Sequence, residues 1–394
     1  MGAGQAGAAL VARLRGLGFG GPLTLIGAEP VPPYQRPPLS KKYLTGEMAR
    51  ERLFLRPEAF YAEQGIDLRL GRPVTAIDRA TRTLRLGDEV LGWDRLVLAT
   101  GAAPRRLPAA LGGDLPGVHV MRSLADADAM APAFRPGARV VIVGGGYIGL
   151  EAAAVAATRG LRVTLIEAAP RILARVACAE TADWFRDLHR AHGVEILEGA
   201  AVERLTGDTR VTGVDLAGGQ HIPCDFAIVG IGVVPGTALA AAAGLEIADG
   251  IAVDALGRTS DPDIWAAGDC ACFPYGGGRL RLESVQNAID QAEAVAANLM
   301  GAAEPYVPMP WFWSDQYDAK LQIAGLGAGA DRIVVRQAEG RSHWYFAGDR
   351  LLAVDAMNDA RAYMVGKRLL EGGHSADPAR ISDPATVLRS LLPA

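Results

Sequence analysis

The fold is decided by residues 139–167, which read RVVIVGGGYIGLEAAAVAATRGLRVTLIE. Arg139–Val143 is a short run rich in β-branched residues that ends in glycines, a pattern typical of a buried parallel strand. The alanine-rich segment after the glycines reads as a helix to about Arg159, and Gly160 stops it. Arg162–Ile166 repeats the strand pattern. These residues therefore predict a βαβ unit with a glycine-rich loop before its helix.

The loop of this unit has the spacing G-x-G-x-x-G, at Gly144, Gly146 and Gly149. The first glycine permits the tight turn, the second lets the backbone approach a pyrophosphate, and the third lets the helix pack on the strand. The helix N-terminus adds N–H donors and a partial positive charge for the phosphates. We therefore predict that a dinucleotide binds at this loop.

Glu167 ends the second strand about 20 residues beyond the loop, where such sites carry an acid. A carboxylate at this place accepts the ribose hydroxyls of NADH and repels the 2′-phosphate of NADPH. Arg171 and Arg175 follow, either within reach of that phosphate or as solvated charges. Because the acid is present, the sequence favours NADH.

A second loop of the same kind opens the chain, GAGQAG at residues 2–7. A helical segment from Ala8 to about Leu17, an apolar run at Leu23–Ile26 and the acidic Glu29 follow in the same order. The strand that should precede the loop has no residues, which would leave its neighbours' backbone groups unpaired. We expect either that the native chain begins several residues upstream or that a neighbouring segment fills the gap.

The rest of the chain shows weaker patterns. Val97–Gly101 reads as a strand that runs into a turn, and Val285–Leu299 reads as a helix. After the prolines at 305, 308 and 310 the pattern changes to alternating segments, which suggest an antiparallel sheet followed by helices. The predicted strands are Arg332–Arg336, His343–Phe346 and Leu351–Asp355, and the predicted helices are Arg361–Leu370 and Val387–Leu392.

The bulk properties exclude several classes of protein. The chain has 394 residues, enough for two or three domains, and a net charge of −4 with no basic stripe that would indicate nucleic acid. Its longest apolar stretch contains glycines and a glutamate, which is not typical of a membrane helix. The four cysteines, Cys178, Cys224, Cys270 and Cys272, fit neither a disulfide framework nor a zinc site, so we expect reduced thiols in the cytoplasm. Cys270 is expected to be a small residue at the start of a helix.

Several further segments occur together with the two loops. They are Pro33–Lys41, Ala99–Gly101, Gly268–Cys270, Glu283–Asn287 and Trp311–Gln316. With these segments in this order along the sequence, the chain resembles the NADH-dependent [2Fe–2S] ferredoxin reductases that serve bacterial cytochrome P450 and ring-hydroxylating dioxygenase systems. The resemblance spans nearly the whole chain, and residues 33–41 and 311–316 are its most specific parts.

The resemblance implies an α/β, glutathione-reductase-like fold with two Rossmann-type dinucleotide-binding domains and an α+β C-terminal domain. It implies an FAD domain at residues 1–107 and 236–304, an NADH domain at 108–235 and a C-terminal domain at 305–394. The cofactors are FAD and NADH, and no metal site is expected. The partner is a [2Fe–2S] ferredoxin, expected to be acidic, with Arg279, Arg281, Lys320 and Arg332 as candidate docking residues, and neither nucleic acid nor a membrane is a partner.

The resemblance also assigns individual residues. Those implied to hold FAD are Gly2, Gly4, Gly7, Glu29, Arg36, Lys41, Lys42, Val74, Ala99, Thr100, Gly101, Arg122, Gly268, Asp269 and Val285. Those implied to hold NADH are Gly144, Gly146, Tyr147, Ile148, Gly149, Glu151, Glu167 and Arg175. Lys41 beside the reactive flavin nitrogen, Glu151 near the nicotinamide and Trp313 at the electron-exit face are implied to be catalytic.

Three alternative functions share these motifs. A disulfide or peroxide reductase needs a cysteine beside the flavin, and neither the first helix nor residues 33–41 contain one. The same electron transfer with rubredoxin or a quinone as acceptor remains open. So does a slow-turnover flavoprotein that senses NADH, as the resemblance to apoptosis-inducing flavoproteins allows. The segment 311–316 favours the ferredoxin partner.

Overall fold

The computed structural model describes residues 1–393, which form two compact units. Unit 1 comprises Met1–Gln35, Ala49–Ala103 and Val233–Pro308, and unit 2 comprises Arg36–Met48, Pro104–Gly232 and the residues from Met309 on. Each unit is therefore assembled from three separate stretches of chain. The division into an FAD, an NADH and a C-terminal domain stays a proposal, because the last two lie within one unit.

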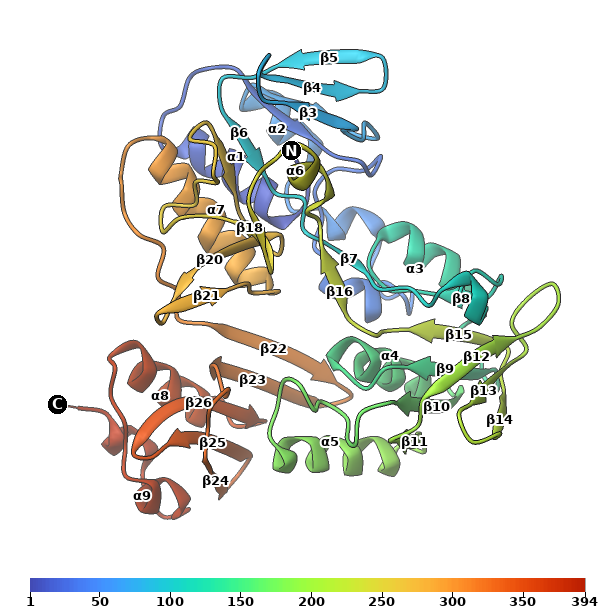
Figure 1. Ribbon diagram of the computed structural model, residues 1–394. Coiled ribbons are helices and arrows are strands. Elements are labelled where there is room, and N and C mark those ends of the chain that lie inside the picture. Colours follow the sequence, from blue (N-terminus) through green and yellow to red (C-terminus); the bar gives the residue numbers. More distant parts are fainter. Residues whose placement is uncertain (394) are drawn as a thin grey trace. The chain divides into compact units, whose positions relative to one another are not determined.

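Unit 1 is built around the first glycine-rich loop. Its helices are α1 (Gln5–Gly16), α2 (Glu58–Glu63), α6 (Ala238–Ala242) and α7 (Val285–Leu299). Its strands are β1 (Leu23–Ile26), β2 (Ile66–Arg69), β3 (Ala76–Asp78), β4 (Thr83–Leu86), β5 (Glu89–Gly92), β6 (Leu96–Leu98), β7 (Ala102–Pro104), β16 (Val233–Pro235), β17 (Ile247–Ala248), β18 (Gly250–Ala252), β19 (Ile264–Ala266), β20 (Ala271–Tyr275) and β21 (Gly278–Leu280). β1 pairs in parallel with β2, and β6 with β19. Helices α1 and α7 pack together through Leu10, Ala292 and Val295, and Figure 1 shows them side by side.

Met1 and Gly2 lie between β1 and β6. The Gly2 N–H donates to the carbonyl of Ile26, and the Ala99 N–H donates to the carbonyl of Met1, both at 2.8 Å. The Met1 amino group donates to the carbonyl of Val97 at 2.8 Å. These two residues thus pair with backbone groups of β1 on one side and of β6 and the residue after it on the other.

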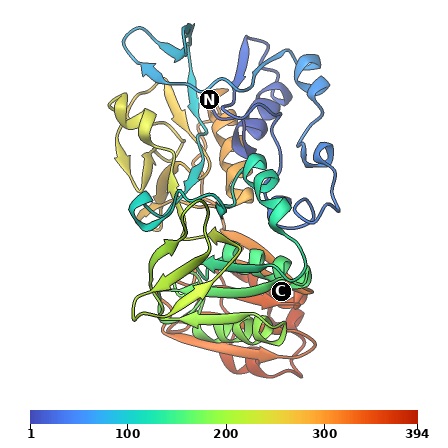
Figure 2. The same cartoon turned by 90° about the vertical axis from the view of Figure 1, so that its right-hand side faces the viewer.

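Unit 2 contains a parallel sheet that carries the second loop. Its strands, in spatial order, are β11 (Glu195–Glu198), β10 (Arg162–Glu167), β9 (Arg139–Val143), β15 (Phe226–Val229) and β8 (Val118–His119). The helices of this part are α3 (Leu124–Met130), α4 (Tyr147–Thr158) and α5 (Ala179–Ala191), and an antiparallel sheet is formed by β12 (Val202–Thr206), β13 (Gly213–Leu216) and β14 (His221–Pro223). The predicted strand–loop–helix–strand order is therefore confirmed. Figure 2 shows the strands of this sheet, in green, in a view turned by 90° from that of Figure 1.

The C-terminal part of unit 2 is an antiparallel sheet covered by a helix. Its strands, in spatial order, are β22 (Trp311–Gln316), β23 (Ala319–Gly325), β26 (Arg350–Met357), β25 (Arg341–Ala347) and β24 (Arg332–Gln337). Helix α8 (Ala360–Glu371) packs on β23 and β26, and α9 (Pro378–Ser382) lies beside β24. Trp344, Phe346, Val354 and Leu369 form its core. The fold is thus the predicted α/β, glutathione-reductase-like one with an α+β C-terminal part.

Two details of the sequence interpretation are corrected. Cys270 does not start a helix: it is buried, its thiol donates to the carbonyls of Leu98 and Ala267 at 3.5 Å, and β20 follows it. The apolar residues after Cys270 are enclosed between β18 and β21, a long-range pairing that local pattern does not reveal. The predicted helix near Val387–Leu392 is only the 3₁₀ turn η5 (Leu388–Leu391). Within residues 1–393, no helix has the length and apolar character needed to cross a bilayer.

Candidate functional site

The glycine-rich loops of the two units share one local geometry at their first glycine. Gly2 has φ +108° and Gly144 has φ +109°, a region that favours glycine. A Cβ at Gly2 would lie 2.0 Å from the carbonyl oxygen of Ala99, and one at Gly144 would lie 2.4 Å from that of Gly230. The chain therefore requires glycine at both turns.

The third glycine of each loop is required by close packing. A Cβ at Gly7 would lie 1.9 Å from the carbonyl oxygen of Gly2, and one at Gly149 would lie 2.0 Å from that of Gly144. In each case the helix passes directly over the first turn of its own loop. Glycine is thus the residue that lets helix and loop approach in both units.

At the second position of each loop glycine is favoured for a different reason. A Cβ at Gly4 or at Gly146 would meet nothing within 4 Å. These residues are the N-caps of α1 and α4, and neither helix has a side-chain cap or an acid in its first turn. Open space beside uncapped N–H donors is what a pyrophosphate requires, so the two loops fit FAD and a nicotinamide dinucleotide.

An acidic side chain is held in place after each loop. The Glu167 carboxylate, at the end of β10, accepts the N–H groups of Gly145 and Ala169, both at 2.7 Å. Glu29, which follows β1, accepts the hydroxyl of Tyr34 at 2.6 Å. Both carboxylates are half-buried. The structure thus holds the acid that follows each loop in a fixed position, and its contact with a ribose stays a prediction.

A buried cluster in unit 2 surrounds Glu151, on α4. Its Oε2 lies 3.0 Å from Nζ of Lys41 and 3.1 Å from the hydroxyl of Ser40, which donates to it. Its Oε1 accepts the hydroxyl of Ser314, on β22, at 2.8 Å. Glu151 is 8% exposed. The structure therefore brings together two of the three residues predicted to be catalytic, Lys41 and Glu151.

Aromatic side chains extend this part of unit 2. The Tyr147 ring lies against that of Phe312, with centroids 5.0 Å apart, and Trp313 follows on β22. The Tyr147 hydroxyl is buried without a hydrogen-bond partner among residues 1–393, and burial raises its pKa well above the ordinary value. Ile148, next along α4, is 42% exposed.

The remaining predicted FAD residues are divided between the units. Unit 1 carries Val74, Ala99, Thr100, Gly101, Gly268, Asp269 and Val285, whereas unit 2 carries Arg36, Lys41, Lys42 and Arg122. The Thr100 hydroxyl donates to the carbonyl of Gly236 at 2.6 Å, and Arg36 donates to the carbonyl of Arg122 at 2.7 Å. Lys42 is exposed. The FAD contacts of these residues stay a prediction.

One candidate docking residue, Arg281, is not available at the surface. Its side chain is only 9% exposed and pairs with Glu283 at 2.6 Å. It also donates to the carbonyl of Asp269 at 3.2 Å. The charge of Arg281 is therefore neutralised within unit 1, whereas Arg279, Lys320 and Arg332 are exposed.

A second buried polar cluster joins α5 to the C-terminal sheet. The Thr181 hydroxyl donates to Oδ2 of Asp355 and lies beside Nδ1 of His343, both at 2.7 Å. The Tyr345 hydroxyl also donates to Asp355, and it accepts the N–H of Cys178 at 2.8 Å. These bonds anchor the start of α5 and with it the loop that follows Glu167.

Burial shifts the titration of three groups in unit 2. It lowers the pKa of His189 to about 4 and that of His343 to about 4, and it raises the pKa of Asp355 to about 6. Both histidines are therefore neutral in the folded chain near neutral pH.

We expect the protein to lose stability between pH 7 and pH 5 because of His189 and His343. In the window between pKa 4 and 6.5 the unfolded chain binds protons that the folded chain does not, so stability falls as the pH falls. Each histidine should cost about 2 kcal/mol at pH 5. Asp355 has the opposite effect. As the pH falls through about 6 the folded chain binds a proton at Asp355 that the unfolded chain does not, and this offsets part of the loss of stability.

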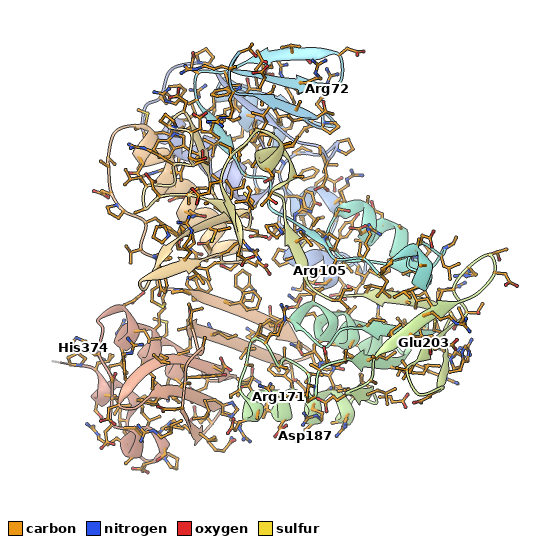
Figure 3. The ribbon with its side chains drawn as sticks, in the orientation of Figure 1. Arg72, Arg105, Arg171, Asp187, Glu203 and His374 are labelled. Carbon is orange, nitrogen blue, oxygen red and sulfur yellow. The ribbon has the colours of Figure 1, made fainter. Side chains whose placement is uncertain are left out.

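Urea unfolding of the wild type and of His189→Gln at both pH values measures this effect. The variant should lose about 2 kcal/mol less than the wild type. The control is His374→Gln, at an exposed histidine labelled in Figure 3. An unchanged pH dependence in His189→Gln would show that His189 does not titrate in this way.

Two family models match the chain. Residues 1–292 match the family described as pyridine nucleotide-disulphide oxidoreductase. The chain belongs to the pyridine nucleotide-disulphide oxidoreductase family. Residues 311–392 match a second model, described as the reductase C-terminal domain.

Relatives within this family match over nearly their full length. Rhodocoxin reductase of Rhodococcus erythropolis is 43% identical, over 97% of this chain and 91% of the relative. The covalent putidaredoxin reductase–putidaredoxin complex has a TM-score of 0.95 at 40% identity, covering 99% of this chain and 96% of the other. The ferredoxin reductase for the CYP199A2 system of Rhodopseudomonas palustris also has a TM-score of 0.95, at 41% identity, covering 99% and 98%.

Sequence reasoning missed several residues around Glu151 in this pyridine nucleotide-disulphide oxidoreductase. They are Ser40, Ser314, Gln316 and His189. Ser314 and Gln316 lie two residues apart within Trp311–Gln316, a spacing that puts both on one face of a strand. This two-residue spacing could have identified Ser314 and Gln316 as neighbours on the strand. Nothing local in the sequence connects His189 to this site.

Proposed function

We propose that this chain is a ferredoxin–NAD(+) reductase, which passes electrons from NADH through FAD to a [2Fe–2S] ferredoxin. The observation that carries the proposal is the pair of matching glycine loops, one in each unit, together with the buried Lys41–Glu151 pair. Two dinucleotide loops in one chain support electron transfer between a flavin and a nicotinamide. The names of the relatives supply the acceptor, because rhodocoxin, putidaredoxin and ferredoxin reductases match the whole chain.

The protein's own part in this reaction is to bind, orient and exclude water. FAD, when bound, supplies the hydride acceptor and the step from a two-electron donor to a one-electron acceptor. The loop at Gly2–Gly7 and Glu29 would hold the adenosine and pyrophosphate of FAD, and the loop at Gly144–Gly149 and Glu167 would hold those of NADH. Lys41, held by Glu151 at 3.0 Å, would supply a positive charge to the flavin when FAD is bound. Trp313, on β22, would lie at the face from which electrons leave.

The downstream partner is an acidic ferredoxin that serves a cytochrome P450 or a ring-hydroxylating oxygenase, in the cytoplasm. Exposed Arg279, Lys320 and Arg332 are the candidate docking charges. Disulfide chemistry has no support here. All four cysteines are free, and three of them, Cys224, Cys270 and Cys272, are buried.

Glu167→Gln should reduce the preference for NADH over NADPH about tenfold. The carboxylate repels the 2′-phosphate of NADPH, and the amide removes that charge. The amide can accept only one of the two N–H groups, of Gly145 and Ala169, that the carboxylate accepts, so KM for both nucleotides should also rise. Arg171 offers no phosphate site to compensate, because its guanidinium donates to the carbonyls of Ala177 and Cys178 at 2.8 and 3.4 Å. Figure 3 labels Arg171. The ratio of kcat/KM for the two nucleotides is the measurement, and an unchanged ratio would remove Glu167 from nucleotide selection.

The function itself is tested by stopped-flow absorbance of the purified flavoprotein. The flavin band should bleach on mixing with NADH and recover on addition of a [2Fe–2S] ferredoxin. Rubredoxin, a quinone, peroxide and a disulfide serve as competing acceptors. Recovery with one of these and not with any ferredoxin would overturn the assignment, and a reduced form that persists with every acceptor would indicate an NADH sensor.

A further inference from the structure

Side chains from α4, β22 and α5 form a chain of hydrogen bonds within unit 2 that ends on Glu151. Ser314 donates to Oε1 of Glu151 at 2.8 Å, and Nε2 of Gln316 donates to the Ser314 hydroxyl at 3.1 Å. Oε1 of Gln316 lies 2.8 Å from Nε2 of His189, and the Tyr317 hydroxyl lies 3.2 Å from Nδ1 of the same ring. The chain thus connects α5 with the carboxylate beside Lys41.

The part of this chain from Glu151 to His189 is enclosed by protein. Ser314 and His189 are 0% exposed, Gln316 is 1% exposed and Glu151 is 8% exposed. A polar group buried to this degree depends on its protein partners, because leaving one unsatisfied costs about 1–3 kcal/mol. The bonds therefore constrain one another.

The donors of the chain all point toward Glu151. Because the amide nitrogen of Gln316 donates to Ser314, its carbonyl oxygen faces His189 and can only accept. His189 must then carry its hydrogen on Nε2, which leaves Nδ1 to accept from Tyr317. Since burial lowers the pKa of His189 to about 4, the ring has no second hydrogen near neutral pH.

We propose that Ser314, Gln316 and His189 are positioning residues that hold the Glu151 carboxylate against Lys41. The proposal rests on the proposed function, in which Lys41 acts beside the flavin. Lys41 and Ser40 occupy Oε2 of Glu151, and the chain occupies Oε1, so the carboxylate cannot rotate without losing bonds on both oxygens. Strand β22 is suited to this role because the alternate residues 314 and 316 are buried toward the site, whereas Asp315 between them is exposed.

The direct test uses variants of β22 in the purified holoprotein. Ser314→Ala should lower the rate of flavin reduction at saturating NADH about tenfold, which corresponds to the loss of one hydrogen bond to a charged group. KM for NADH should stay within about twofold, because the nucleotide loop is untouched. Ser314→Thr retains the hydroxyl and should restore the rate, and Asp315→Ala is the matched control on the opposite face.

A second test does not depend on activity. ¹⁵N NMR of histidine-labelled protein reports which ring nitrogen carries hydrogen, and the His189→Gln variant assigns the signals. The wild type should show hydrogen on Nε2 of His189 and none on Nδ1 at pH 7. In Gln316→Met the acceptor is gone, and this fixed tautomer should be lost.

The outcomes separate this proposal from the proposed function. Wild-type hydride transfer in Ser314→Ala, or hydrogen on Nδ1 of His189 in the wild type, would overturn the proposal. An equal loss in Ser314→Thr and Ser314→Ala would do the same, because it would indicate simple packing. A wild type that NADH does not reduce would sink the proposed function, and the tautomer would then still decide whether the donor chain exists.

Discussion

Substitution of Gly149 by alanine is expected to lower the rate of flavin reduction by NADH at least a hundredfold. The added Cβ would lie 2.0 Å from the carbonyl oxygen of Gly144, far inside the closest approach of such atoms. The turn is held in place, because the Gly144 N–H donates to the carbonyl of Ile166 at 2.8 Å. Helix α4 must therefore move off the loop, and the N–H donors meant for the pyrophosphate move with it.

The matched variant is Gly146→Ala, three residues earlier in the same loop. Its Cβ meets no atom within 4 Å, so its melting temperature should equal that of the wild type. Its KM for NADH should nevertheless rise about tenfold, because the methyl group stands where the backbone must approach the nucleotide. Stopped-flow reduction and thermal unfolding of both variants separate a folding effect from a binding effect. Wild-type reduction in Gly149→Ala would contradict the assignment of this loop.

Glu151→Gln is expected to slow flavin reduction about a hundredfold. The carboxylate is the partner of Lys41 at 3.0 Å, and the two side chains are only 10% and 20% exposed. Removing one partner of a buried pair leaves the other charge uncompensated, at a cost of about 3–5 kcal/mol. The amide also presents two hydrogens to a site that already contains the donors Ser40 and Ser314. Lys41 should therefore lose its fixed position.

A double-mutant cycle measures whether this effect acts through Lys41. Combined with Lys41→Met, Glu151→Gln should add little further loss, because both changes remove the same interaction. Glu203→Gln, at an exposed residue labelled in Figure 3, is the control for loss of a carboxylate elsewhere in unit 2. Additive losses in the cycle would mean that Glu151 and Lys41 act separately.

Several elements could be predicted from sequence, either because glycine or proline bounds them or because their apolar residues recur with the period of a strand or a helix. Arg139–Val143, Leu23–Ile26 and Val285–Leu299 appear in the structure with the predicted bounds. Helix α5 was not predicted. Gly193 follows its end, but its start has neither glycine nor proline, and its N-cap, Cys178, makes no side-chain capping bond. The misassignment of Cys270 has a related cause, since its surroundings come from β18 and β21, whose pairing only the folded chain defines.

The candidate site divides in the same way. The residues of the glycine loops and the acids at 29 and 167 follow a fixed spacing, so the sequence identifies them. The resemblance to a known family identified Lys41 and Glu151 as candidates. Their contact could not be predicted, because the two residues lie more than a hundred positions apart in the sequence. The partners Ser314, Gln316 and His189 come from two further elements. No local rule in the sequence brings α5 and β22 to the same carboxylate.

The assembly of unit 1 from three stretches of chain has a consequence for biosynthesis. Helix α1 leaves the ribosome before the other helices of unit 1, yet the face it presents to α7 stays uncovered until residue 299 has been made. If translation proceeds at about 5–20 residues per second, about 15–60 seconds pass between the synthesis of α1 and that of α7, which packs on it. Contacts of such sequence separation also slow folding. Unit 1 therefore cannot complete its folding until its last stretch, Val233–Pro308, has been made.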